Sequence, residues 1–69
     1  MKPLTAADVA GMVRNVYALR HDPEAAHAAE DELHVLVLQK IASDMCVDPR
    51  ACALQALTTE EIKFDRWCA

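Results

Sequence analysis

Apolar residues recur every three or four positions between Asp22 and Ser43, which is the spacing of one long α-helix. At about 100° per residue, one broad face of this helix carries Ala26, Ala29, Leu33, Leu36, Val37 and Lys40. Val35, Leu38 and Ile41 point elsewhere, so the second half of the helix is apolar nearly all round. A helix of this kind is normally buried on more than one side, either by the rest of its own chain or by a second copy.

Two Asp-Pro pairs mark the starts of helices. Aspartate is a good N-cap, and proline suits the first helical position, where a missing N–H costs nothing. Asp22-Pro23 therefore begins the long helix. Asp48-Pro49 predicts a further helix, which ends near Leu57.

The first segment of the chain also has the signature of a helix start. Thr5 can cap a helix with Asp8 three positions on, which predicts a helix from about Ala6 to Leu19. Its apolar stripe consists of Val9, Met12, Val13, Val16 and Tyr17. Gly11 costs this helix roughly 1 kcal/mol relative to alanine, which predicts the close approach of another helix. The connection to the long helix is short and predicts an antiparallel hairpin.

A capping signature appears again near the end of the chain. Thr58 is followed by Glu61 three positions on, and Leu57 and Ile62 are placed as the flanking apolar pair. We expect a short fourth helix here, with 3₁₀ or irregular backbone over residues 63–69. These elements predict a single all-α domain over residues 1–69, a small bundle of three helices around a central long helix, with a short C-terminal fourth helix and no sheet.

Composition leaves little material for a core. The chain has 69 residues, of which 54% are hydrophobic, but many of these are alanines and there is only one Trp, one Tyr and one Phe. Chains of this size often add a disulfide, a metal or a partner subunit. The extra apolar surface of the long helix therefore favours a homodimer.

The charge and the apolar runs of the chain indicate which classes of partner it can bind. The net charge is −4 and the seven Lys and Arg residues are scattered, whereas phosphate binding requires a basic patch. The chain does not open on a charged segment followed by an apolar one, and its longest strongly apolar run, from Val35 to Leu38, is too short to span a bilayer. We expect a cytoplasmic protein that binds neither nucleic acid nor membrane.

The three cysteines, Cys46, Cys52 and Cys68, are an odd number without CxxC spacing. This pattern fits neither a secreted disulfide framework nor a zinc knuckle, so we expect reduced thiols. Cys52 lies one turn into its helix, where the helix dipole can lower the pKa of a thiol. The favoured alternative for Cys52 is a small buried residue.

One cluster of polar residues on the long helix is a candidate metal site. Its members stand at i, i+3, i+4 and i+7 and are His27, Glu30, Asp31 and His34. Imidazoles and carboxylates at such spacings bind metals in helical bundles, although one helix rarely completes a site and a dimer would have to double the ligands. The favoured interpretation is structural, with these side chains pairing with one another and with Arg66 or Arg20. A divalent metal is the alternative to a protein without a cofactor.

The end of the chain concentrates large side chains, namely Phe64, Arg66 and Trp67. The favoured interpretation is that the two aromatic residues plug one end of the bundle. If they are exposed, these three residues would instead form a binding hot spot. A tail that covers the long helix would bring Arg66 to Glu30 or Asp31, and Trp67 beside His27 or His34.

The sequence has no catalytic signature. It lacks a Ser-His-Asp order, a Gly-rich phosphate loop and a Cys-centred motif, and 69 residues rarely enclose a catalytic cleft. We expect that the protein is not an enzyme but a small interaction module that binds another protein. The alternative is a metal-binding helical protein.

Three patterns resemble those of small uncharacterised proteins from bacteriophages, prophages and some bacterial genomes: His27-x-x-Glu30-Asp31-x-Leu33-His34, Leu38-x-x-Ile41-Ala42 and Ile62-x-Phe64-x-Arg66-Trp67-Cys68-Ala69. The resemblance covers about residues 22–69 and leaves the first helix unmatched. It implies a phage or mobile-element context and an accessory role. The interaction module is therefore expected to be an accessory or inhibitory protein of phage origin. The resemblance also makes the His-Glu-Asp cluster and the Arg-Trp end look like one linked feature.

Overall fold

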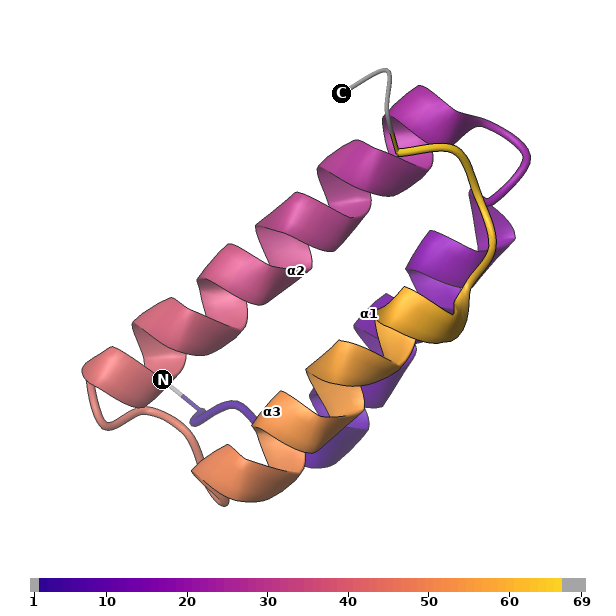
Figure 1. Ribbon diagram of the computed structural model, residues 1–69. Helices are drawn as coiled ribbons and strands as arrows, with labels where there is room; N and C mark the ends of the chain where they lie inside the picture. The colour runs from indigo at the N-terminus through magenta and orange to yellow at the C-terminus, as the bar shows by residue number, and fades with distance from the viewer. Residues whose placement is uncertain (1, 67–69) are drawn as a thin grey trace.

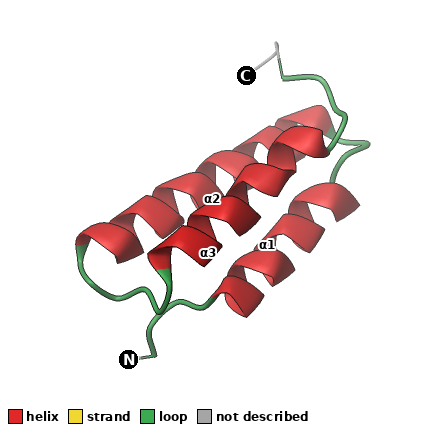
Figure 2. Cartoon of the chain, turned by 60° about the horizontal axis from the view of Figure 1, so that its bottom comes forward, coloured by secondary structure: helices red, strands yellow, loops and turns green. Residues whose placement is uncertain are grey.

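The computed structural model describes residues 2–66, which fold into three helices. The helices are α1 (Ala6–Ala18), α2 (Pro23–Ala42) and α3 (Pro49–Leu57), and α3 continues into a 3₁₀ turn, η1 (Thr58–Glu61). Figures 1 and 2 show the helices side by side, with α1 and α2 forming an antiparallel hairpin. Residues 2–66 contain no strand, only one isolated β-bridge between Leu4 and Cys46. The predicted all-α bundle is confirmed.

The helices begin where the sequence predicts. The Thr5 hydroxyl accepts a hydrogen bond from the Asp8 N–H at 3.2 Å, and the Asp8 carboxylate accepts one from the Thr5 N–H at 3.0 Å. The side chains of Asp22 and Asp48 each accept a bond from the backbone N–H three residues on, at 3.3 and 3.1 Å. All three helices are therefore capped by their own sequence, because each cap satisfies an N–H that lacks a partner within the helix.

The core lies where the three helices meet. Its buried apolar residues are Leu4, Val9, Val16, Ala26, Leu33, Val37, Cys52, Ala56 and Ile62. As predicted, α1 and α3 both pack along α2, and they also pack against each other. Cys52 and Ala56 on α3 are small side chains of this core. The core is therefore built by all three helices and not around α2 alone.

The predicted fourth helix is the 3₁₀ turn η1, which follows α3 without a break. Thr58 does not cap it, so that part of the prediction is wrong. The backbone of Thr58 is helical, with φ −64° and ψ −16°, whereas an N-cap residue needs extended backbone. The hydroxyl of Thr58 instead donates to the carbonyl of Gln55 at 2.6 Å, so Thr58 belongs to the end of α3.

One member of the predicted α1 stripe lies outside the core. Val9 and Val16 are buried, and Met12 and Val13 pack against them, but Tyr17 is 52% exposed. The Arg20 guanidinium lies 3.9 Å from the centre of the Tyr17 ring, and it also donates to the Tyr17 carbonyl at 3.0 Å. Tyr17 therefore packs against the turn between α1 and α2 rather than into the bundle.

The predicted close approach at Gly11 is wrong for the part of the chain that the structure describes. A methyl group built at Gly11 would meet only the end of the Arg14 side chain, at an ordinary contact distance of 3.5 Å. Gly11 lines an open depression between α1 and α2 instead.

Gly11→Ala is therefore expected to stabilise the protein by about 0.5–1 kcal/mol, because alanine favours the helix and restricts the unfolded chain without creating a clash. Urea unfolding followed by circular dichroism would measure this change. Ala28→Gly, at an exposed position of α2, serves as the control and should destabilise by a similar amount. A loss of stability in Gly11→Ala would mean that another group occupies this space.

Candidate functional site

Glu30 is the buried charge around which the polar contacts of the protein are arranged. The positions of Ala26, Glu30, Leu33 and Val37 follow one another at steps of four, three and four residues, so they share the core face of α2. Glu30 is only 6% exposed. A carboxylate at such a position requires a partner, because the burial of an unpaired charge is costly.

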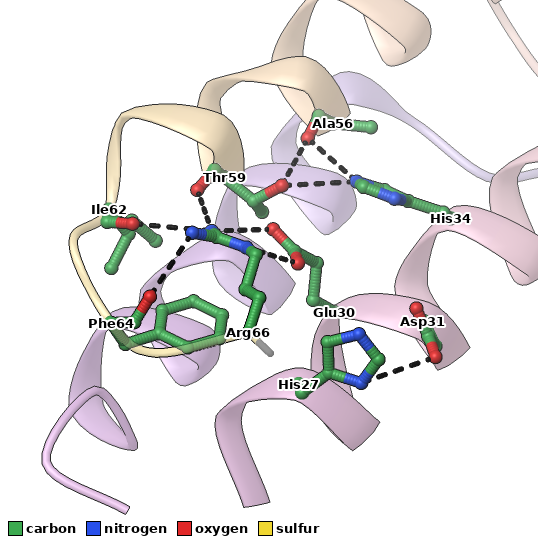
Figure 3. Close-up of polar contacts among 9 residues, drawn as sticks. All are labelled: His27, Glu30, Asp31, His34, Ala56, Thr59, Ile62, Phe64 and Arg66. Carbon is green, nitrogen blue, oxygen red and sulfur yellow. Dashed lines mark hydrogen bonds and ion pairs between the residues drawn. The ribbon is translucent and has the colours of Figure 1, made fainter. Parts of the chain in front are cut away.

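Arg66 is that partner, and Figure 3 shows its guanidinium between α2 and the C-terminal segment. Its Nε donates to Oε1 of Glu30 at 2.9 Å, and its Nη2 donates to Oε2 at 3.0 Å. The same Nη2 lies 3.0 Å from the Thr59 carbonyl and 3.2 Å from the Ile62 carbonyl. The guanidinium also lies 3.8 Å from the centre of the Phe64 ring. We call this set of contacts the Arg66 latch, because it fastens the C-terminal segment to α2.

The contacts of the latch stabilise the ionised forms of both Glu30 and Arg66. The bond from Arg66 is the main cause that lowers the pKa of Glu30 below its ordinary value of 4.5, against the opposing effect of burial. Smaller contributions in the same direction come from the Thr59 hydroxyl and from His34. The Glu30 carboxylate in turn raises the pKa of Arg66. The predicted contact between Arg66 and an acidic residue of the cluster is confirmed, with Glu30 rather than Asp31 as the partner.

A second set of contacts joins α2 to the end of α3. Nε2 of His34 lies 3.0 Å from the Thr59 hydroxyl oxygen and 3.3 Å from the Ala56 carbonyl, and the Thr59 hydroxyl donates to that carbonyl at 3.1 Å. A carbonyl can only accept, so these contacts assign a proton to Nε2 of His34. Thr59 is fully buried and takes part in both sets of contacts. Its hydroxyl lies beside His34, and its carbonyl accepts a hydrogen bond from Arg66.

The four residues predicted as metal ligands do not converge on one point. Figure 3 shows Glu30 facing Arg66 and His34 facing Thr59, whereas Nδ1 of His27 lies 3.5 Å from Asp31 on the outer side of α2. Within residues 2–66 there is no group of three or more His, Cys, Asp or Glu side chains arranged to hold a metal ion. The metal alternative stays a prediction, and elemental analysis of untagged protein would test it.

The predicted hot spot at the end of the chain is only partly described. Phe64 is half-buried and packs against the core, and Arg66 is bound in the latch. Trp67 and Cys68 lie outside the described residues, and so does the predicted contact of Trp67 with His27 or His34. These contacts of Phe64 and Arg66 agree with the favoured interpretation of a role in the fold, and the binding hot spot stays a prediction.

Cys46 and Cys52 form no disulfide within the residues that the structure describes. Cys52 is fully buried, and burial is the main cause that raises the pKa of its thiol to about 11, with the neighbouring Cys46 adding to the effect. The position near the start of α3 does not lower this pKa. Cys52 is thus a small core residue rather than a reactive thiol.

One surface feature was not singled out by the sequence. A groove of about 290 Å³ runs between α2 and α3 and is lined by His34, Val37, Leu38, Ile41, Ala53, Ala56 and Leu57. Leu38 and Leu57 at its edges are 66% and 53% exposed. Leu54, one turn before Leu57 on α3, is 57% exposed. The signal in the sequence was the apolar second half of α2, of which the described residues cover only one side.

None of the described helices has the length and the apolar character needed to cross a membrane. No protein-family model, no curated protein and no solved structure matches this chain.

Proposed function

We propose that this protein is a small, non-enzymatic interaction module that accepts an apolar helical surface of a protein in the groove between α2 and α3. The observation that carries the proposal is the exposure of Leu38 and Leu57 on either side of a groove with an apolar floor. Large exposed leucines gathered around a groove are typical of protein docking sites, and a groove between two helices suits the apolar face of a further helix.

The character of the surface favours a protein over other ligands. The chain carries a net charge of −4, which disfavours a phosphate backbone as the partner. The residues that line the groove are aliphatic apart from His34, whose Nε2 is already bonded. Such a lining offers few groups for orienting a small polar substrate, but it suits the burial of aliphatic side chains.

The groups that could do chemistry are used within the fold, which supports a role without catalysis. Glu30 is held by Arg66, and the Cys52 thiol is buried with a raised pKa. Together with the resemblance to small phage and prophage proteins, this favours an accessory or inhibitory protein that acts in the cytoplasm by binding.

Site-specific photocrosslinking in cells that naturally produce the protein tests the proposal. A photoreactive amino acid in place of Leu38 should give one defined protein adduct, and Leu57→Glu in the same chain should abolish it, because both residues border the groove. The same probe in place of Arg14, which is exposed on α1, is the matched control and should give no such adduct. If position 38 gives no adduct beyond that control, the groove is not a docking site.

A further inference from the structure

We infer that Arg66 occupies a preformed guanidinium-binding site, and that this site binds an arginine side chain of a partner protein when the C-terminal segment detaches. The site consists of the Glu30 carboxylate and the backbone carbonyls of Thr59 and Ile62. The inference goes beyond the proposed function, because neither Glu30 nor Arg66 lines the α2–α3 groove.

The oxygen atoms of the site match a guanidinium group. Nε and Nη2 of Arg66 lie 2.9 and 3.0 Å from the two carboxylate oxygens of Glu30, which is a bidentate pair. Nη2 also lies 3.0 and 3.2 Å from the carbonyls of Thr59 and Ile62, so that all these oxygens surround one end of the group (Figure 3). A planar fork of N–H donors fits this arrangement, whereas the ammonium group of a lysine does not make the paired bonds.

The fold holds these oxygen atoms in place without the help of Arg66. Glu30 lies on the core face of α2, and its side chain is only 7% exposed. Thr59 is fully buried, and its hydroxyl donates to the Ala56 carbonyl at 3.1 Å. The N–H of Ile62, another core residue, donates to the Thr59 carbonyl at 3.0 Å. A guanidinium therefore finds a site that is already ordered, which lowers the cost of binding.

The segment that supplies Arg66 is fastened less firmly than the site. Residues 63–66 form neither helix nor strand, and the contacts described for them are the packing of Phe64 and the bonds of Arg66. The Arg66 side chain is 35% exposed, so the guanidinium is reached from the surface while the carboxylate is inside. Detachment of such a segment gives a minor open state of roughly 0.1–10%.

The segment itself indicates the chemistry of the partner. The Arg66 guanidinium lies 3.8 Å from the centre of the ring of Phe64, two positions earlier. A partner that makes the same contacts has an arginine on a non-helical segment, with an aromatic residue two positions before it. The net charge of −4 attracts such a cationic segment.

Thermal unfolding of the Arg66→Ala chain in the presence of methylguanidinium tests the site. At about 50 mM, methylguanidinium should raise the unfolding midpoint of this variant by about 3 °C or more, because it binds the folded state alone. Tetramethylammonium has the charge without the N–H donors, and urea has a similar shape without the charge, so neither should raise the midpoint at the same concentration. If Arg66→Ala is unfolded in buffer, methylguanidinium should restore its helical circular dichroism.

Three other proteins serve as controls for this experiment. Methylguanidinium should not stabilise the wild type, whose site is filled, nor the double variant Glu30→Gln with Arg66→Ala, which lacks the carboxylate. Arg20→Ala also removes an arginine that lies over an aromatic ring, and it should not be stabilised either. No gain in Arg66→Ala, or an equal gain in Arg20→Ala, overturns the guanidinium site.

Nuclear magnetic resonance of the intact wild-type chain tests the exchange with a partner. The Arg66 Nε–H, which donates to Glu30, gives a signal that reports the closed latch. A peptide with the sequence of residues 63–66, acetyl-Lys-Phe-Asp-Arg-amide, should weaken this signal at millimolar concentration. The same peptide with lysine as its last residue should leave the signal unchanged. A signal that neither peptide alters, or that both alter equally, overturns the binding of a partner arginine.

Discussion

Replacing Arg66 by alanine is expected to lower the free energy of unfolding by about 2–3 kcal/mol, a large fraction of the stability of so small a domain. The variant leaves the Glu30 carboxylate buried without a cation and removes a donor from the Thr59 and Ile62 carbonyls. Breaking a fully buried ion pair costs about 3–5 kcal/mol. The loss expected for Arg66→Ala is smaller than this because the pair is only partly buried. The Glu30 side chain is 7% exposed, but that of Arg66 is 35% exposed.

The chain offers a matched control for this substitution in Arg20. Arg20 also lies over an aromatic ring and also donates to a backbone carbonyl, but within residues 2–66 it has no bond to a buried carboxylate. Arg20→Ala should therefore cost less than about 1 kcal/mol. Chemical denaturation of both variants at neutral pH gives the comparison, and equal losses would show that the bond to Glu30 contributes little.

A double-mutant cycle isolates the pair itself. Glu30→Gln should also destabilise the protein, and the double variant Glu30→Gln with Arg66→Ala should lose less than the sum of the two single losses, because the second substitution removes an interaction already broken. A difference of about 1 kcal/mol or more is expected for residues in one hydrogen-bond network. Strict additivity would mean that the two side chains stabilise the fold independently of each other.

Sequence patterns predicted the helix starts well because caps are local. Thr5 with Asp8, and the pairs Asp22-Pro23 and Asp48-Pro49, act on N–H groups within three residues of themselves, and the structure places all three caps where they were expected. Tertiary packing has little influence on such short contacts. The failure at Thr58 has the same physical basis, because the choice between the end of α3 and the start of a new helix depends on whether the chain turns there, and here it does not.

The burial of Glu30 was harder to predict because its residue type and its position disagree. As a carboxylate beside Asp31 it was grouped with the exposed polar cluster, but its spacing from Ala26, Leu33 and Val37 places it on the core face. Spacing alone could have separated Glu30 from His27 and Asp31. The bonds that stabilise it there could not be derived from spacing, because they come from residues more than 25 positions away, including Arg66.

The sequence pattern does not determine what covers the apolar surface of α2. The sequence predicts that an all-round apolar helix is covered either by its own chain or by a second copy, and it cannot choose between them. In the described residues α1 and α3 cover one side of α2 and leave Val35 and Leu38 about 52% and 66% exposed. This apolar surface of α2 is exposed within residues 2–66, and the mass of the protein in solution distinguishes the two possibilities.

Acidification is expected to weaken the wild-type protein through Glu30 in a way that Glu30→Gln does not share. The folded state holds the pKa of Glu30 below the ordinary value of 4.5, so the unfolded state takes up this proton first as the pH falls. The stabilisation by the ionised carboxylate is therefore fully present above the unfolded pKa, and it is lost as the pH falls through the lower, folded pKa. Arg66 stays protonated over this whole range, since its own pKa is raised.

The measurement is the difference in unfolding free energy between the wild type and Glu30→Gln as a function of pH. The other carboxylates titrate in both proteins and largely cancel in this difference. Wild type should be more stable at neutral pH, and its advantage should shrink steadily below about pH 4.5. An advantage that stays constant down to the acid transition would show that the charge of Glu30 does not stabilise the fold, and that its bonds with Arg66 would serve equally well with a neutral amide.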